Sequence, residues 1–272
     1  MTVTGVSRRL MRAESPDVGY LQLHELDFSS LASAIEDIRP DVVIHAAAEG
    51  SVDAVEADPF KYRYVNETLP GQLAELTQTR AIQFVYLSSN AVYGEQVAPW
   101  NEKSAQSPIN SYGELKRMAE IHVSEANSNA LIVRPIMMYG WPLDSGRDNP
   151  VSFWIKRLSS GQSVSVVSDV ETQPLYAGDC AASIWMAIQK ELKGSLNISG
   201  GSTLSLFEFA RVSADVFEFD LKNVHAISAR DLKGLAPRPT LTEFDLSKLT
   251  KVLEFNPYEP AAGLRIMRNE AH

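Results

Sequence analysis

The chain has 272 residues, of which 44% are hydrophobic and 22% charged, a balance typical of one large globular domain or two intimate lobes. Its net charge of −9 argues against a nucleic-acid-binding surface, since basic residues cluster only at Arg8-Arg9 and Lys116-Arg117. No apolar run approaches the ~18 residues that cross a bilayer, and the first residues lack the pattern of a signal peptide.

The cysteine and histidine residues indicate the cellular compartment to expect and whether a metal site is present. Cys180 is the single cysteine, which excludes an internal disulfide and favours a reducing compartment, so we expect a cytoplasmic protein. The five histidines are scattered, and no pair of them has the spacing of metal ligands. We therefore expect no metal site.

Strand-like and helix-like segments alternate in the first half of the chain. The expected strands are Val3–Val6, Asp41–Ala48, Gln83–Leu87 and Ala130–Val133, and the expected helices are Leu31–Ile38, Tyr62–Arg80 and Ser111–Glu125. This order predicts an α/β fold, a Rossmann-like doubly wound parallel sheet with helices on both faces.

The second half is less regular. We expect helices at Pro150–Ser160, Asp179–Lys190, Leu204–Phe217 and Leu246–Leu253, and strands at Ser163–Val167 and Ser195–Ile198. The predicted division is a cofactor domain over residues 1–134, with returning segments near 163–198, and a smaller, mostly helical substrate lobe over 135–272.

Chemistry-bearing residues follow the strand Gln83–Leu87 and recur on the next helix. Ser89 lies just beyond the strand, and Tyr112 and Lys116, four residues apart, share one helix face. A tyrosine hydroxyl has a pKa near ~10, and a neighbouring ammonium lowers it by favouring the phenolate. With a serine hydroxyl on the same oxygen, the set would polarise a carbonyl for hydride attack. A Tyr-x-x-x-Lys pair alone is usually a surface pair. The catalytic interpretation therefore depends on the combination of this pair with Ser89, in chain order, at the ends of successive strands.

Longer segments make a family resemblance plain. The chain resembles an extended short-chain dehydrogenase/reductase of the NAD-dependent epimerase/dehydratase family, closest to the dTDP-4-dehydrorhamnose reductase-like branch. The resemblance covers nearly the whole chain and rests on residues 39–48, Val65-Asn66, 84–94, 108–116 with Glu120, Arg134-Pro135, Tyr139-Gly140, 173–179, 196–200 and Pro237-Arg238-Pro239.

The resemblance implies roles for individual residues. Ser89, rather than Ser88, takes the catalytic serine position, Tyr112 is the acid/base, and Lys116 tunes Tyr112 and holds the nicotinamide ribose. Asn66 is expected to be structural. The other cofactor-binding residues implied in this part of the chain are Ala46, Ala47, Ala48 and Pro135.

The expected substrate is a nucleotide-linked sugar. Asn90 occupies the position where water-eliminating relatives carry an acid, and its amide cannot act as one, which argues against a 4,6-dehydratase. Arg238 could pair with a diphosphate, or it is an exposed loop arginine between two prolines. The substrate-contacting residues that we expect are Ser89, Asn90, Tyr139, Trp141, Asn149 and Arg238.

The glycine-rich turn that opens this fold, and that binds the cofactor pyrophosphate, is not found in these residues. Val3-Thr-Gly5 is a poor match for it, because Gly5 and Ala46 are only 41 residues apart and Pro16 interrupts the helix that would follow. We interpret Val3–Val6 as the second strand of the unit, with roughly 25–30 residues of strand, turn and helix missing ahead of it.

In that register Ser7, Arg8 and Arg9 fall at the end of the second strand. Arginine there suits the 2′-phosphate of NADP, whereas NAD binders carry an acid, so NADP is the expected cofactor and NAD the alternative. A solvated basic turn is the plain alternative for these residues. Asp27 and Phe28 would lie beside the adenine.

Three explanations for the missing turn stay open: a start site assigned too late, a shortened chain, or a paralogue in which a partner or a dimer replaces the missing part. We favour the first, because Ser89, Tyr112 and Lys116 are all present. The principal functional hypothesis is an NADP-dependent reductase or epimerase acting on the keto group of a nucleotide sugar, with a homodimer possible. The alternative is a partner-binding subunit, since the branch also includes a regulatory subunit of methionine adenosyltransferase.

Overall fold

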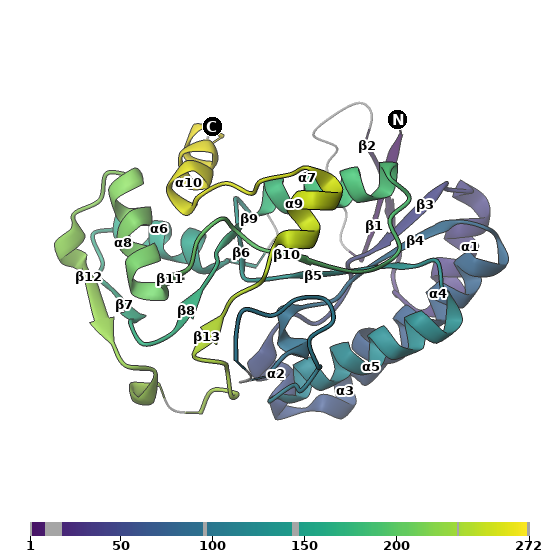
Figure 1. Ribbon diagram of the computed structural model, residues 1–272, viewed down its shortest axis with the longest axis horizontal. Helices are drawn as coiled ribbons and strands as arrows, with labels where there is room; N and C mark the ends of the chain where they lie inside the picture. Colours follow the sequence, from purple (N-terminus) through teal and green to yellow (C-terminus); the bar gives the residue numbers. More distant parts are fainter. Residues whose placement is uncertain (1, 9–17, 95–96, 143–146, 233, 271–272) are drawn as a thin grey trace.

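The computed structural model describes residues 2–8, 18–94, 97–142, 147–232 and 234–270 (Figure 1). Its centre is a parallel sheet of four strands in the described residues, in the order β10-β5-β4-β3. The strands are β3 (Val42–His45), β4 (Gln83–Leu87), β5 (Leu131–Pro135) and β10 (Gly194–Ile198). All three pairings are parallel, as the alternating pattern of strands and helices predicted.

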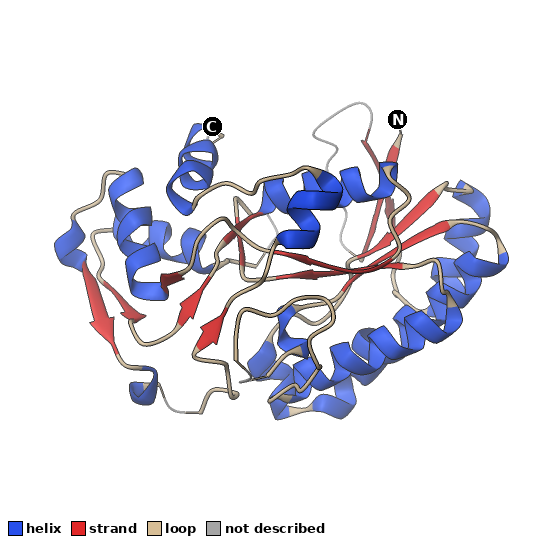
Figure 2. Ribbon diagram, viewed as in Figure 1, coloured by secondary structure: helices blue, strands red, loops and turns tan. Residues whose placement is uncertain are grey.

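Helices cover both faces of this sheet (Figure 2). Phe84 and Tyr86 of β4 pack against α4 (Leu69–Thr79) and α5 (Ser111–Ala126). On the other face, Val85 joins α7 (Ala177–Gln189) and α9 (Ser247–Leu253) in a second cluster. Because side chains alternate along a strand, the continuous apolar run of β4 serves both clusters.

A separate parallel pair is formed by β1 (Val3–Ser7) and β2 (Val18–Gln22), in the register Val3↔Val18 to Ser7↔Gln22. In the doubly wound order 3-2-1-4-5-6, strand 2 pairs with strand 3, and strand 4 with strand 5. The pairs β1–β2 and β3–β4 match this order only if β1 is strand 2 and β3 is strand 4. The pairing therefore agrees with the register inferred from the sequence, with position 1 between β1 and β3 not filled by the described residues.

Several helices connect these strands. α1 (Phe28–Ile38) ends at Arg39, whose φ of 51° lies in the left-handed region just before Pro40. The helix expected over Tyr62–Arg80 is divided into α3 (Pro59–Arg63), a π-helical turn at Tyr64–Thr68 and α4, and a short helix α2 (Val52–Ala57) precedes it. A 3-10 turn at Asn90–Val92 follows β4.

The remaining residues form the lobe drawn at the left of Figure 1. Its helices are α6 (Pro150–Ser159), α8 (Leu206–Val216) and α10 (Pro260–Asn269), with 3-10 turns at Leu221–Asn223 and Ala229–Asp231. Small sheets pair β6 (Met138–Tyr139) with β9 (Leu175–Tyr176), β7 (Val164–Val167) with β12 (Val224–Ile227), and β8 (Glu171–Thr172) with β11 (Leu204–Ser205) and β13 (Leu241–Thr242). The lobe is thus richer in strands than the sequence indicated, because its two-residue strands are too short for a detectable period. The boundary at residue 134 stays a prediction.

Candidate active site

The catalytic serine and tyrosine predicted from the sequence meet at the carboxyl end of β4. Ser89 Oγ accepts a hydrogen bond of 3.1 Å from the Ala91 amide and thereby begins the 3-10 turn. The Ser89 hydroxyl is close enough to Tyr112 to stabilise the phenolate form of the tyrosine. A carbonyl oxygen placed between them would contact both groups, which is the arrangement that polarises a ketone.

The first turn of α5 brings Tyr112 into this position. Asn110 caps the helix, because its Oδ1 accepts a hydrogen bond of 2.8 Å from the Gly113 amide. A Cβ on Gly113 would lie 2.1 Å from the Ala91 carbonyl oxygen, so only glycine allows the helix to approach the 3-10 turn this closely. Tyr112 is consequently only 9% exposed.

Lys116 lies one turn further along α5 and is also buried. Its Nζ donates a hydrogen bond of 2.9 Å to the Leu87 carbonyl and lies 6.0 Å from the centroid of the Tyr112 ring. Burial lowers the pKa of Lys116 to about 8, against the opposing effect of Glu120. The ammonium therefore loses its proton much more readily than an exposed lysine does.

The expectation that Lys116 lowers the pKa of Tyr112 differs from what the structure shows. Burial raises the pKa of Tyr112, the Ser89 hydroxyl opposes this rise, and the charge of Glu49 adds to it. Desolvation of the phenolate is the largest cause, because the ring is almost completely covered. Tyr112 is therefore held as the protonated phenol, the form that donates a proton to a carbonyl oxygen.

A buried ion pair fixes α5 against β5. Arg134 and Glu120 are joined at 2.6 Å, with side chains 5% and 4% exposed. Arg134 Nη1 also donates to the Tyr93 hydroxyl at 2.6 Å, and Gln106 Nε2 donates to Glu120 at 2.5 Å. Since Glu120 is one turn beyond Lys116, the network fixes the helix that carries both Tyr112 and Lys116.

The segment after β3 is held by Asn66, which is completely buried in the π-helical turn. Its amide accepts a hydrogen bond of 2.8 Å from the Glu49 amide and donates one of 3.0 Å to the Glu49 carbonyl. These bonds fix the backbone beyond Ala46, Ala47 and Ala48, of which Ala46 and Ala48 are exposed. Asn66 is thus structural, as expected, and the small residues leave the backbone accessible.

Residues expected at the adenine end lie on and after the β1–β2 pair. Ser7 ends β1, and the Arg8 carbonyl accepts a hydrogen bond of 3.1 Å from Gln22 Nε2, while Arg9 lies outside the described residues. Asp27 caps α1 by accepting a hydrogen bond of 2.8 Å from the Ser30 amide, and the Phe28 amide donates to the Tyr64 hydroxyl at 3.0 Å. Capping accounts for Asp27 without a cofactor, so its cofactor role stays a prediction.

Four residues predicted to contact substrate have structural partners within the chain. Tyr139 is 1% exposed and bonds the Pro260 carbonyl, which leaves it no surface for a ligand. Asn149 caps α6. Trp141 donates to the Met267 carbonyl at 2.5 Å and contacts Phe217 edge-on, at the α10 side of the lobe. Arg238 forms an ion pair with Asp53 at 2.8 Å.

The ion pair of Arg238 joins the two halves of the chain near Tyr112. Asp53, on α2, also accepts a hydrogen bond of 2.9 Å from the Ala236 amide, and Asn110 donates one of 2.9 Å to the Pro237 carbonyl. Residues 236–238 therefore pack against α2 and the start of α5. Arg238 is an exposed loop residue, as the plain alternative had it, with its side chain 41% exposed while paired with Asp53. Its binding of a diphosphate stays a prediction. Sequence reasoning did not indicate Asp53, because its partner is 185 residues away.

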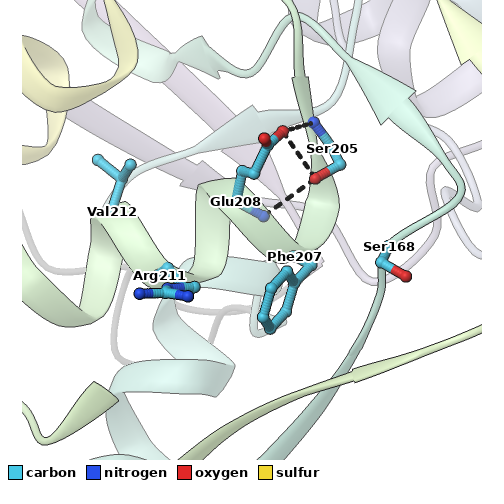
Figure 3. A pocket seen from close by; sticks show the side chains of 6 residues that line it. All are labelled: Ser168, Ser205, Phe207, Glu208, Arg211 and Val212. Atoms are coloured by element: carbon cyan, nitrogen blue, oxygen red, sulfur yellow. Dashed lines mark hydrogen bonds between the residues drawn. The ribbon is translucent and has the colours of Figure 1, made fainter. Parts of the chain in front are cut away.

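The pocket in Figure 3 lies elsewhere, between α8 and the segment after β7, and is lined by Ser168, Ser205, Phe207, Glu208, Arg211 and Val212. Glu208 accepts hydrogen bonds from the amide and the hydroxyl of Ser205. These polar groups are therefore used in capping α8. None of the predicted site residues lines it. We therefore place the candidate site at the β4–α5 edge.

Within the described ranges, no group of three or more histidine, cysteine or carboxylate side chains could hold a metal ion. The same residues contain no helix long and apolar enough to cross a membrane. Sequence reasoning also gave no role to His45 and Tyr86, whose side chains lie beside Lys116. Their apolar strand context was the only signal available, and it indicated core packing.

The chain is similar to known proteins over most of its length. The chain is 28% identical over 243 residues to methionine adenosyltransferase 2 subunit beta of Xenopus tropicalis, covering 87% of this chain and 72% of that protein. It is 27% identical over 272 residues to a dTDP-4-dehydrorhamnose reductase of Sinorhizobium fredii, covering 92% and 90%. The crystal structure of dTDP-4-dehydrorhamnose reductase from Bacillus anthracis in complex with NADP superposes with a TM-score of 0.86 at 24% identity over 100% of both chains, which shows a shared fold. The family model for the RmlD substrate binding domain matches residues 3–271, and the chain therefore belongs to that family.

Proposed function

We propose that this chain is an NADP-dependent reductase acting on the keto group of a nucleotide-linked sugar, with an epimerase of the same substrate class as the alternative. The observation that carries the proposal is the set of Ser89, Tyr112 and Lys116 at the carboxyl end of β4. Family membership and the dTDP-4-dehydrorhamnose reductase relative support the reaction class.

The residues fit the nicotinamide half of the cofactor. Lys116 has three N–H donors, and the hydrogen bond to Leu87 uses one of them, which leaves donors for ribose hydroxyls. Ala46 and Ala48 are exposed beside it, and Pro135 ends the adjacent strand β5. When bound, the reduced nicotinamide supplies a hydride to the substrate carbon. The pyrophosphate half has no glycine-rich turn to bind it in these 272 residues.

The protein groups supply the other half of the reaction. Ser89 donates a hydrogen bond to the carbonyl oxygen, and Tyr112, held protonated by burial, transfers its proton to that oxygen as negative charge develops there. Lys116 faces the tyrosinate that results and stabilises it by charge. The sequence of events needs no acid at Asn90, consistent with reduction rather than elimination of water.

The test is turnover of NADPH with a panel of nucleotide-linked keto sugars. Tyr112→Phe should lower kcat by about 10²–10⁴-fold, the contribution of a general acid, without changing the far-UV circular dichroism. Tyr258→Phe is the matched control, because Tyr258 is 47% exposed. Unchanged turnover in Tyr112→Phe would overturn the mechanism.

Titration calorimetry with NADPH separates binding from chemistry. We expect the chain to bind NADPH through the nicotinamide half, and Lys116→Met to remove this binding. If Arg8 contacts the 2′-phosphate, NADPH should bind slightly more tightly than NADH. Equal affinity for NADPH and NADH would exclude the proposed role of Arg8.

A second candidate function is that of a partner-binding subunit. The specific observation in its favour is the 28% identity to methionine adenosyltransferase 2 subunit beta. Size-exclusion chromatography of this chain with a methionine adenosyltransferase catalytic subunit distinguishes the two. A stable complex, together with no turnover on the sugar panel, would favour the subunit role over the reductase.

A further inference from the structure

An aromatic pair lies against the ammonium of Lys116. His45 of β3 and Tyr86 of β4 are register partners, and their rings are stacked with centroids 6.1 Å apart and planes at 18°. Nζ of Lys116 lies over the Tyr86 ring, 4.9 Å from its centroid. The rings and the ammonium thus form one continuous contact between two strands and α5.

All three side chains of this contact are buried, which strengthens the attraction between the ammonium and the ring. Lys116 is 3% exposed, Tyr86 0% and His45 5%, so little water reaches the ammonium. Among the described residues Lys116 donates a hydrogen bond to the Leu87 carbonyl, which satisfies a single donor of three. The face of an aromatic ring carries partial negative charge and attracts a cation within about 6 Å, most strongly where the cation is desolvated.

Core packing alone explains the tyrosine poorly. The Tyr86 hydroxyl and His45 Nε2 are both buried without a hydrogen-bond partner among the described residues, an arrangement that costs stability. Leucine or isoleucine would fill a strand position without that cost. An electron-rich ring at this position has a use that an aliphatic side chain lacks, since it stabilises a buried positive charge.

We propose that Tyr86 is a positioning residue that keeps Lys116 charged and in place beside Tyr112 through the face of its ring, with His45 holding that ring in position. The proposal rests on the proposed function for its consequence in catalysis, because Lys116 must carry a charge to stabilise the tyrosinate. The contact itself exists in the chain without cofactor or substrate.

Other charged and titratable groups also face Lys116 and must stay constant in any test. They are Tyr112 and Glu120 on α5, His45 on β3, Glu49 beyond β3 through its effect on Tyr112, and Arg134 on β5 through its pairing with Glu120. Burial, with a smaller effect of Lys116, lowers the pKa of His45 to about 4, so the imidazole is neutral at pH 7 and adds no competing charge. Of these groups, His45 stacks directly on Tyr86, and Tyr86→Phe controls for its displacement because it keeps the ring.

The experiment follows the Nζ resonance of Lys116 by nitrogen-15 NMR as a function of pH in the free chain, assigned with Lys116→Arg. In the unaltered chain Lys116 should titrate near pH 8. Tyr86→Leu should lower that pKa by about one unit, because loss of a desolvated cation–π contact disfavours the charged form. Tyr86→Phe keeps the ring and should restore the original value to within a few tenths of a unit.

A fluorinated series keeps the test decisive if Tyr86→Leu does not fold. Phenylalanine at position 86 with one, two or five ring fluorines has nearly constant shape but a progressively less negative face. The Lys116 pKa should fall steadily along the series. A pKa that is the same throughout, or the same in Tyr86→Leu and Tyr86→Phe, would overturn the proposal and leave Tyr86 a packing residue.

The catalytic arm uses the same variants with NADPH and the keto sugar. In the profile of kcat/KM against pH, the decrease at alkaline pH should occur at lower pH in Tyr86→Leu than in the unaltered chain. In Tyr86→Phe it should occur at the same pH as in the unaltered chain. If the unaltered chain reduces no sugar, the proposed function fails while the NMR titration still decides the role of Tyr86. If the chain is active and the alkaline decrease does not move, the positioning role in catalysis is wrong.

Discussion

The four-stranded sheet and the β1–β2 pair contain similar residue types but bury them to different extents. Val85 of β4 and Leu131 of β5 are completely buried, between helices on both faces. Val3 of β1 is 42% exposed, and Ile44 of β3, the edge strand next to β4, is 49% exposed. An apolar strand residue is buried only where neighbouring elements cover it, and Val3 and Ile44, both on edge strands, lack such cover among the described residues.

This difference divides the candidate site. Ser89, Tyr112 and Lys116 belong to the well-packed region, whereas Ser7 and Arg8 follow the exposed pair. The residues proposed for proton transfer are therefore carried by buried elements, whereas those proposed for the 2′-phosphate lie on an exposed strand pair. We expect stability to be divided in the same way.

The largest expected effect comes from the buried ion pair of the well-packed region. Arg134→Leu leaves Glu120 buried without its partner and should lower the free energy of unfolding by about 3–5 kcal/mol. Arg117→Leu is the control, since the Arg117–Glu114 pair is 30% and 48% exposed and should cost less than about 1 kcal/mol. Urea unfolding at pH 7 measures both, and equal losses would show that the network does not support α5.

His45 sits at the border between the two regions and should make stability depend on pH. Its pKa in the folded chain is lowered from 6.5 to about 4, so the unfolded chain binds the proton more readily between these values. Stability should then fall as pH decreases through this window, by about 2–3 kcal/mol between pH 7 and 4.5 for this group. Urea unfolding of His45→Asn should show a shallower loss over that range.

His225→Asn is the matched substitution for this prediction, because His225 is exposed. Its loss of stability between the two pH values should equal that of the unaltered chain. A parallel loss in all three proteins would mean that His45 becomes protonated as easily in the folded state as in the unfolded state.

The smallest effect is expected on the β1–β2 pair. Val85→Ala should cost about 2–3 kcal/mol, because it removes two methyl groups from a filled core. Val3→Ala should cost less than about 0.5 kcal/mol, since the side chain is already largely solvated. Thermal unfolding monitored by circular dichroism compares the two, and a large loss in Val3→Ala would show that the exposed strand is as well supported as the sheet.

The local pattern of residues determined much of this protein. Gln83–Leu87 is a strand with the predicted bounds, and Tyr112 and Lys116 share a helix face as their spacing required. The parallel sheet and the interpretation of Val3–Val6 as a second strand also followed from the sequence. These features depend on periodicity and on chain connectivity, which are local properties that a single sequence contains.

Only the tertiary structure decided which polar residues are free to meet a ligand. Tyr139 is enclosed in the lobe core, Asn149 caps a helix, and Arg238 is paired with Asp53 across 185 residues. The pKa of Tyr112 is raised rather than lowered, because its desolvation depends on everything packed around it. The cation–π contact between Tyr86 and Lys116 likewise joins a strand to a helix. Burial and long-range pairing arise from the packed chain as a whole, so residue type and spacing could not reveal them.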